Sequence, residues 1–171
     1  MDLKILKLAA VGCLAFSLVG CAAKKKEVKK EEPKQEEQKP PEQAEEPSLR
    51  NKDYKEMPEV ATVYFELDQA TLRPEARAVL QKNFEALKGH ADWEALVEGH
   101  SDERGTTEYN LGLGQRRAAA VRQYYMTLGL DGARIATISY GKENPACTEH
   151  TEGCWAKNRR GVTKVRGTEG K

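Results

Sequence analysis

The polar side chains between Val97 and Val121 are the part of this chain whose types and spacing could do chemistry. The segment reads VEGHSDERGTTEYNLGLGQRRAAAV, and it leads from the end of a predicted strand through a turn into a predicted helix. Loops that follow strands commonly display binding groups. Asp102 lies in this loop, and Arg117 lies in the helix beside Ala118, where packing of its stem can fix its pose. On spacing alone, Asp102 could instead cap the turn, and the arginines could be solvated charges.

His100, Ser101 and Asp102 include the residue types of a hydrolase triad, but they are consecutive. Adjacent side chains on an extended segment point to opposite faces, so these three cannot form the relay that such chemistry needs. Neither a second catalytic carboxylate nor a nucleophile elbow is evident in the sequence. The pattern therefore favours a binding protein over an enzyme, and we expect no cofactor.

Cys147 and Cys154 are close in sequence, with His150 between them. Thiolates and imidazole suit zinc, so these three residues could be metal ligands. No fourth ligand is evident nearby, and exported thiols tend to oxidise. We therefore expect a disulfide between Cys147 and Cys154, with metal binding as the alternative.

The N-terminus indicates export. Lys4 and Lys7 precede an apolar stretch, and small residues then lead to Leu18-Val19-Gly20-Cys21. This pattern is typical of a secretory signal peptide (1–20) and is too short to span a membrane. A cysteine at this position resembles a bacterial lipobox, which implies that Cys21 is acylated; an ordinary signal peptide is the alternative. Ala22 is not the aspartate that commonly retains lipoproteins at the inner membrane. We therefore expect outer-membrane attachment with the folded domain in the periplasm.

Residues 21–58 contain mixed runs of lysine, glutamate and proline with almost no apolar residues. Such a segment cannot bury enough surface to offset the entropy of ordering, so we predict a disordered linker. A flexible coil of this length spans roughly 35 Å. The chain has a net charge of +1, which gives no reason to propose nucleic acid as a partner.

Past the linker, the sequence predicts one folded domain over 59–166, followed by a short tail (167–171). Four segments have the β-branched, aromatic or alternating pattern of strands: 60–66, 94–100, 134–140 and 158–165. Pro74 suits the first turn of a helix that Gly89 would end. Thr106 is a plausible N-cap of a second helix that Gly129 closes. The second helix has an apolar stripe at three- and four-residue steps: Leu111, Gly114, Ala118, Val121, Tyr125 and Leu128. A short helical turn is expected around Trp155.

This order of elements predicts an α/β (α+β sandwich) domain, with a mixed four-stranded sheet and both main helices on one face. The order of the strands does not follow from the sequence. Gly161 interrupts the last predicted strand, where glycine weakens pairing or marks a bulge, so the pairing of that strand also stays open.

Several separated motifs, in order, now carry a specific resemblance: Tyr64-Phe65, the segment from Val97 to Val121, Ser139-Tyr140-Gly141-Lys142-Glu143-Asn144-Pro145 and Lys157-Asn158-Arg159-Arg160. Together with the lipobox and linker, they closely resemble the peptidoglycan-associated lipoprotein (Pal) family. That family carries the OmpA-like domain, so the resemblance implies an OmpA-like βαβαβ-β fold.

The resemblance implies non-covalent binding of the peptidoglycan stem peptide, centred on meso-diaminopimelate. In the family pattern, Asp102 and Arg117 bind this amino acid. Its free end carries an ammonium and a carboxylate on one carbon, which a carboxylate and a guanidinium fork complement. Lysine in its place would leave Arg117 without a carboxylate partner, so discrimination against lysine is expected.

Further positions carry over from the family. Asp68 matches an acidic ligand-contacting position, and Arg104 shares the loop of Asp102. Leu67 stands where the family often has an aromatic residue, and Leu113 lines the expected cleft. We assign two other groups to structural roles. Asn158-Arg159-Arg160 is predicted to form a charge network that orders a loop, and Tyr109, Tyr124 and Tyr125 are predicted to pack in the core and between helices.

The resemblance also implies partners. Family members engage TolB and other Tol-Pal components and take part in envelope constriction during division. A protein adaptor that does not bind the wall is the rival interpretation, and peptidoglycan hydrolysis is a weaker one. The sequence does not identify the partner surface.

Overall fold

The last strand of the chain lies inside the sheet, between two strands that precede it in sequence. The computed structural model describes residues 53–167. Its strands are β1 (Val63–Tyr64), β2 (Trp93–His100), β3 (Ile135–Gly141) and β4 (Arg160–Gly167), in the spatial order β1-β4-β2-β3. Strand β4 is antiparallel to β1 and to β2, whereas β2 and β3 are parallel. The predicted mixed four-stranded sheet is therefore confirmed, and the structure supplies the strand order that the sequence left open.

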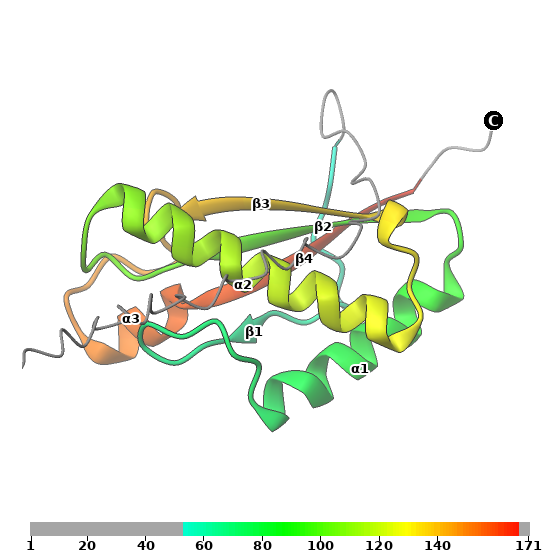
Figure 1. Ribbon diagram of the computed structural model, residues 1–171, viewed down its shortest axis with the longest axis horizontal. Helices are drawn as coiled ribbons and strands as arrows, with labels where there is room; N and C mark the ends of the chain where they lie inside the picture. The colour runs from blue at the N-terminus through cyan, green and yellow to red at the C-terminus, as the bar shows by residue number, and fades with distance from the viewer. Residues whose placement is uncertain (1–52, 168–171) are drawn as a thin grey trace, which may run out of the picture. The chain divides into compact units, whose positions relative to one another are not determined.

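Helices α1 (Pro74–Gly89) and α2 (Thr107–Leu128) cover one face of this sheet (Figure 1). The 3-10 turn η1 (Gly132–Arg134) leads into β3, and the short helix α3 (Glu152–Asn158) precedes β4. Pro74 begins α1, and Thr106 caps α2 by accepting a hydrogen bond from the Tyr109 N–H at 3.2 Å. Gly129 ends α2 with φ 106°, a conformation that suits glycine. The sequence predicted these helix ends correctly.

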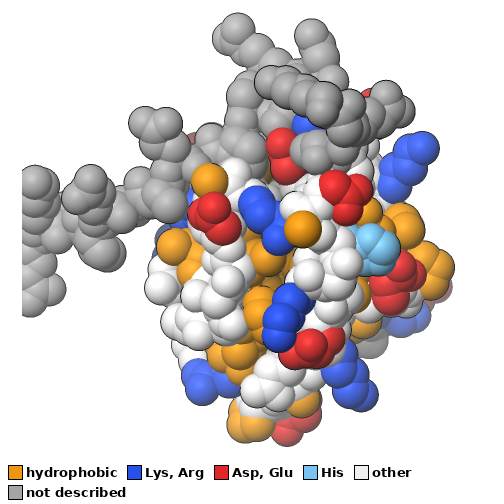
Figure 2. Space-filling model, turned by 90° about the vertical axis from the view of Figure 1, so that its right-hand side faces the viewer, with side chains coloured by type: hydrophobic (Ala, Val, Ile, Leu, Met, Phe, Trp, Pro, Cys, Tyr) orange, Lys and Arg blue, Asp and Glu red, His pale blue; other side chains and the backbone are white. Residues whose placement is uncertain are grey.

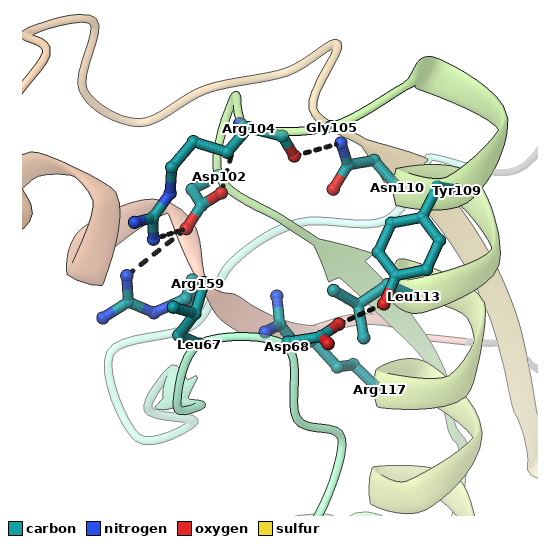
Figure 3. Close-up of a pocket in the computed structure, with 10 residues that line it drawn as sticks. All are labelled: Leu67, Asp68, Asp102, Arg104, Gly105, Tyr109, Asn110, Leu113, Arg117 and Arg159. Carbon is teal, nitrogen blue, oxygen red and sulfur yellow. Dashed lines mark hydrogen bonds and ion pairs between the residues drawn. The ribbon is translucent and has the colours of Figure 1, made fainter.

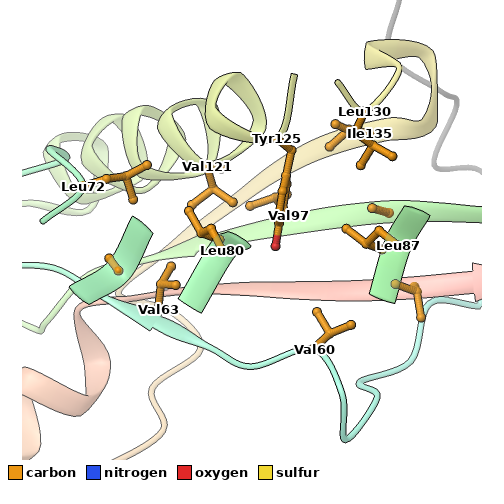
Figure 4. Close-up of a cluster of buried hydrophobic side chains, with 14 of the residues drawn as sticks. Val60, Val63, Leu72, Leu80, Leu87, Val97, Val121, Tyr125, Leu130 and Ile135 are labelled. Carbon is orange, nitrogen blue, oxygen red and sulfur yellow. The ribbon is translucent and has the colours of Figure 1, made fainter. Parts of the chain in front are cut away.

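The hydrophobic core fills the space between the two helices and the sheet (Figure 4). Leu80 and Leu87 from α1 meet Val121 and Tyr125 from α2 over Val97 of β2, and all five side chains are fully buried. The predicted α2 stripe is right from Gly114 to Tyr125, but Leu111 is exposed and Leu128 is only half-buried. In the first two turns of α2, the buried apolar side chain is that of Leu113 instead.

Gly161 does not form a bulge. It pairs with Val63 on one side and with Gly99 on the other. A Cβ at Gly161 would lie 3.3 Å from side-chain atoms of Val63 and Phe65, so glycine leaves room for the core rather than breaking the strand. The irregular register occurs elsewhere, between Gly99 and His100 where β2 pairs with β3.

Strand β1 is shorter than the predicted 60–66. The Phe65 N–H still donates to the backbone oxygen of Arg159 at 2.8 Å, and the chain then turns away into the loop before α1. Residues 53–58, assigned to the end of the linker by the sequence, already contact the domain: Lys55 and Val165 exchange backbone hydrogen bonds of 2.9 and 2.8 Å.

Close packing of α2 on β2 sets the position of the loop between them. A Cβ at Gly99 would lie 1.9 Å from the backbone oxygen of Gly114, so only glycine allows this approach. The approach brings Arg117, one turn beyond Gly114, beside His100 at the end of β2.

The predicted signal peptide, Cys21, most of the linker and the residues after 167 lie outside the described residues. Within 53–167, no helix has the combination of length and apolar character needed to cross a membrane.

Candidate ligand-binding site

A pocket of about 330 Å³ opens between the loop after β1, the loop after β2 and the first turns of α2. Its walls combine charged, polar and apolar side chains (Figure 3): Leu67, Asp68, Asp102, Arg104, Gly105, Tyr109, Asn110, Leu113, Arg117 and Arg159. The structure thus brings together all six residues that the sequence analysis assigned to ligand binding.

Asp102 is nearly buried and is held by two guanidinium groups. Its Oδ2 lies 2.5 Å from Nη2 of Arg104 and 3.3 Å from Nη1 of Arg159, and its Oδ1 accepts the Arg104 N–H at 3.2 Å. Burial acts to raise the pKa of the Asp102 carboxyl, but the Arg104 hydrogen bonds, helped by Arg159, outweigh burial and lower the pKa below its ordinary value. Asp102 both orders the turn and presents an ionised carboxylate.

Arg117 is not a solvated charge, because its side chain is fully buried. Nε donates to the backbone oxygen of Gln69 at 2.8 Å, Nη1 to that of His100 at 2.7 Å, and Nη2 to that of Glu66 at 2.9 Å. Burial lowers the pKa of Arg117 to about 10, so the guanidinium remains charged at neutral pH. Arg117 joins the loop after β1 to the end of β2 beside the pocket, and these three hydrogen bonds leave two of its five N–H groups unused.

Asp68 stands at the rim of the pocket with φ 59°, a left-handed conformation that aspartate tolerates better than most residues. Its Oδ1 accepts a hydrogen bond from the Tyr109 hydroxyl (Figure 3). This hydrogen bond raises the pKa of Tyr109. Asp68 is the more exposed of the two pocket carboxylates.

The packing role predicted for Tyr109 is wrong, because its side chain is 45% exposed and lines the pocket. Tyr125 is fully buried and Tyr124 packs against the core, as predicted. Tyr109 lies in the first turn of α2, ahead of the buried stripe, and that position is the only sequence signal that separates it from the other two.

Arg159 was assigned only to a charge network. It makes that network, with Nη1 on Asp102 and Nη2 at 2.7 Å from Oε1 of Glu152, and it also forms part of the pocket wall. The sequence could not reveal this second role, which depends on the end of α3 lying beside the loop after β2.

The pocket walls hold three arginines against two aspartates. This excess of positive charge favours a ligand that carries a carboxylate, while the aspartates can accept an ammonium. Leu67, 52% exposed, and Leu113 add an apolar surface for a short aliphatic chain. At the end of the domain where α1 and α2 finish, positive and negative side chains are instead scattered among apolar ones (Figure 2).

The alternative assignments made from sequence fit the geometry poorly. The His100 ring lies against Tyr140, with Nε2 3.7 Å from Oε2 of Glu98, while the Asp102 carboxylate pairs with arginines. Cys147 and Cys154 form a disulfide, with Cα atoms 5.3 Å apart, so neither is a free thiolate. No group of three or more potential metal ligands occurs within residues 53–167.

Comparison with known proteins defines the class to which this fold and pocket belong. The OmpA family model matches residues 64–159, more than half of the chain. The chain therefore belongs to the OmpA family.

Among relatives, the peptidoglycan-associated lipoprotein of Rhizobium meliloti (strain 1021) is 45% identical over 105 residues, covering 61% of this chain and 60% of that protein. The peptidoglycan-associated lipoprotein of Pseudomonas aeruginosa is 48% identical over 101 residues, covering 59% of this chain and 60% of that protein. The match thus spans about 60% of the length of these relatives.

Two solved structures support the same assignment. The crystal structure of the peptidoglycan-associated lipoprotein from Burkholderia pseudomallei has a TM-score of 0.60 and 42% identity, covering 61% of this chain and 89% of that one. The cell wall anchor of the T6SS from Pseudomonas aeruginosa has a TM-score of 0.55 and 28% identity, covering 62% of this chain and 79% of that one. The predicted OmpA-like fold and the resemblance to the Pal family are confirmed.

Proposed function

We propose that this protein binds peptidoglycan non-covalently through the pocket around Asp102 and Arg117, and holds the outer membrane to the cell wall. The observation that carries the proposal is the placement of three guanidinium groups and two carboxylates around one pocket of about 330 Å³. Relatives named for their association with peptidoglycan add support. The proposed role is binding, without catalysis.

The proposed ligand is meso-diaminopimelate of the stem peptide. Its free carboxylate would accept hydrogen bonds from the remaining N–H groups of Arg117, which is buried, cationic and held by three backbone oxygens. Its ammonium would lie near the carboxylates of Asp102 and Asp68. Asp102 is already shared between two arginines, so the exposed Asp68 offers the more accessible acceptor. The methylene chain would lie against Leu67 and Leu113.

The proposed anchor is the acylated Cys21, with residues 1–20 removed as a signal peptide. The charged linker would then extend from the outer membrane and hold the domain in the periplasm. We further propose that the protein acts with TolB and other Tol-Pal components to support envelope integrity and constriction during division. Its resemblance to the Pal family supports this part of the proposal.

Co-sedimentation with isolated sacculi that contain meso-diaminopimelate tests the function. Asp102→Asn should reduce the bound fraction at least tenfold, because loss of a charged hydrogen-bond acceptor in a desolvated site costs roughly this much binding. The matched control is Asp131→Asn, because Oδ1 of Asp131 also accepts the N–H two residues on, at 2.9 Å, but Asp131 lies outside the pocket.

Normal sedimentation of Asp102→Asn would reject this pocket as the wall-binding site. A protein that does not sediment at all, but still captures envelope proteins, would instead support the adaptor interpretation. Release of soluble muropeptides from the sacculi would show a hydrolase.

A further inference from the structure

Helix α3 places Trp155 directly against the loop that carries Asp102. The indole Nε1–H donates to Oε1 of Glu103 at 2.7 Å. The guanidinium carbon of Arg104 lies 4.2 Å from the centre of the Trp155 ring, a distance suited to a cation–π contact. Trp155 therefore contacts the two residues that follow Asp102, by two different interactions.

Arg104 links Trp155 to the pocket, because it contacts both Trp155 and Asp102. Its Nη2 forms the 2.5 Å ion pair with Asp102, so the same guanidinium lies on the tryptophan ring and beside the carboxylate. The Arg104 side chain is 36% exposed, and a long side chain at such a position otherwise samples many rotamers. Stacking on Trp155 restricts Arg104 to the rotamer that pairs with Asp102.

Trp155 is itself firmly placed. The preceding residue, Cys154, is buried and bonded to Cys147. The Asn158 side chain accepts the N–H groups of Ala146 and Cys147 at 2.8 and 3.0 Å, and donates to the Cys147 oxygen at 2.7 Å. The disulfide and Asn158 thus fix the loop and α3 to each other, and α3 serves as a rigid support for the indole.

We propose that Trp155 is a positioning residue for ligand binding, which acts through Arg104 to hold the Asp102 carboxylate in its binding orientation. This inference rests on the proposed wall-binding function. Trp155 does not line the pocket, so its effect on affinity would arise from the Arg104 contact rather than from touching the ligand.

Substitutions in the full chain, extracted in detergent and sedimented with diaminopimelate-type sacculi, test the proposal. Trp155→Phe keeps a ring under Arg104 but removes the N–H, and should weaken binding about two- to fivefold. Trp155→Leu removes both interactions and should weaken binding about tenfold. Trp93→Phe is the matched control, since Trp93 stacks on His90 rather than on a pocket arginine and should bind normally.

A double-mutant cycle separates positioning from general stability. If Trp155 acts through Arg104, then Trp155→Leu should cost less than about twofold in binding when it is added to Arg104→Gln. Full additivity of the two losses would overturn the proposal, and so would normal binding by both Trp155 variants while Asp102→Asn fails to bind. Failure of the unaltered protein to sediment would instead reject the proposed function, and this inference with it.

Fluorescence gives a second measurement that a merely structural role would not affect. The chain contains two tryptophans, so Trp93→Phe leaves Trp155 as the only one. Binding of a soluble diaminopimelate-containing muropeptide should then change the emission of Trp155. In Arg104→Gln combined with Trp93→Phe, that change should be lost. Unchanged emission in a protein that binds the muropeptide would contradict the proposal.

Discussion

Nη1 of Arg159 lies 3.3 Å from Oδ2 of Asp102, although the two residues are 57 positions apart in the sequence. Both side chains are only 6% exposed. The ion pair joins the loop after β2 to the end of α3. Arg104 approaches the same oxygen at 2.5 Å from the solvent side. The carboxylate that we propose for ligand binding is therefore placed by two separate segments before any ligand arrives.

This arrangement predicts how stability depends on pH. The folded pKa of Asp102 lies below its ordinary value of 3.8, so Asp102 contributes stability that is fully present above about pH 5. That contribution is lost as the pH falls through the folded pKa. Asp102→Asn should therefore be less stable than the unaltered protein at pH 7, with the difference shrinking toward pH 3. Urea unfolding across this range checks the prediction, and a constant difference would contradict it.

Replacing Arg117 should affect stability as well as binding. Arg117→Lys keeps the charge but cannot reach three backbone oxygens that accept from different nitrogens. We expect a loss of about 2–4 kcal/mol in the free energy of unfolding. The neighbouring, exposed Arg116→Lys is the control and should change stability by less than about 0.5 kcal/mol. Equal stability of the two variants would show that the carbonyl contacts contribute little.

The disulfide should stabilise the domain without being required for folding. In the chain-entropy model, a bridge that closes so short a loop contributes about 2–3 kcal/mol. Asn158 holds the same loop by three hydrogen bonds, so the double variant Cys147→Ser, Cys154→Ser should still fold. Thermal unfolding with and without a dithiol reductant measures the effect. Reductant should lower the melting temperature of the unaltered protein and leave that of the double variant unchanged; an equal response in both would refute this role.

The lipid anchor is testable by fractionation. Cys21→Ser should move the protein from the membrane to the soluble fraction, because it removes the predicted acylation site. Cys13→Ser should leave it at the membrane, since Cys13 lies within the predicted signal peptide. Membrane association of the Cys21 variant would argue against acyl anchoring.

The sequence predicted the features that depend on local chemistry. Pro74, Thr106 and Gly129 mark helix ends because their preferences act within one turn of the chain. The order of the predicted strands and helices indicated that both helices lie on one face of the sheet. The motifs that resemble the Pal family identified six residues that line one pocket.

Features that depend on distant contacts escaped prediction. Gly161 looked like a strand breaker, but it faces Val63, Phe65 and Val121, and the space between them determines the residue type. Arg117 was assigned to ligand binding, but its burial was not predicted, because its backbone partners come from the loop after β1 and from the end of β2. Tyr109 differs from the two packed tyrosines only in lying ahead of the apolar stripe of α2, and that position alone does not place it at the rim of a pocket. Only the folded chain provides these neighbours.

The most direct test of the central claim compares two kinds of cell wall. Sacculi with meso-diaminopimelate in the stem peptide and sacculi with lysine in the same place are incubated with equal amounts of protein, and the bound fraction is measured. The pocket chemistry predicts strong retention on the first and at least tenfold weaker retention on the second, because lysine lacks the carboxylate that pairs with Arg117. Equal retention on both walls would contradict the proposed recognition of diaminopimelate.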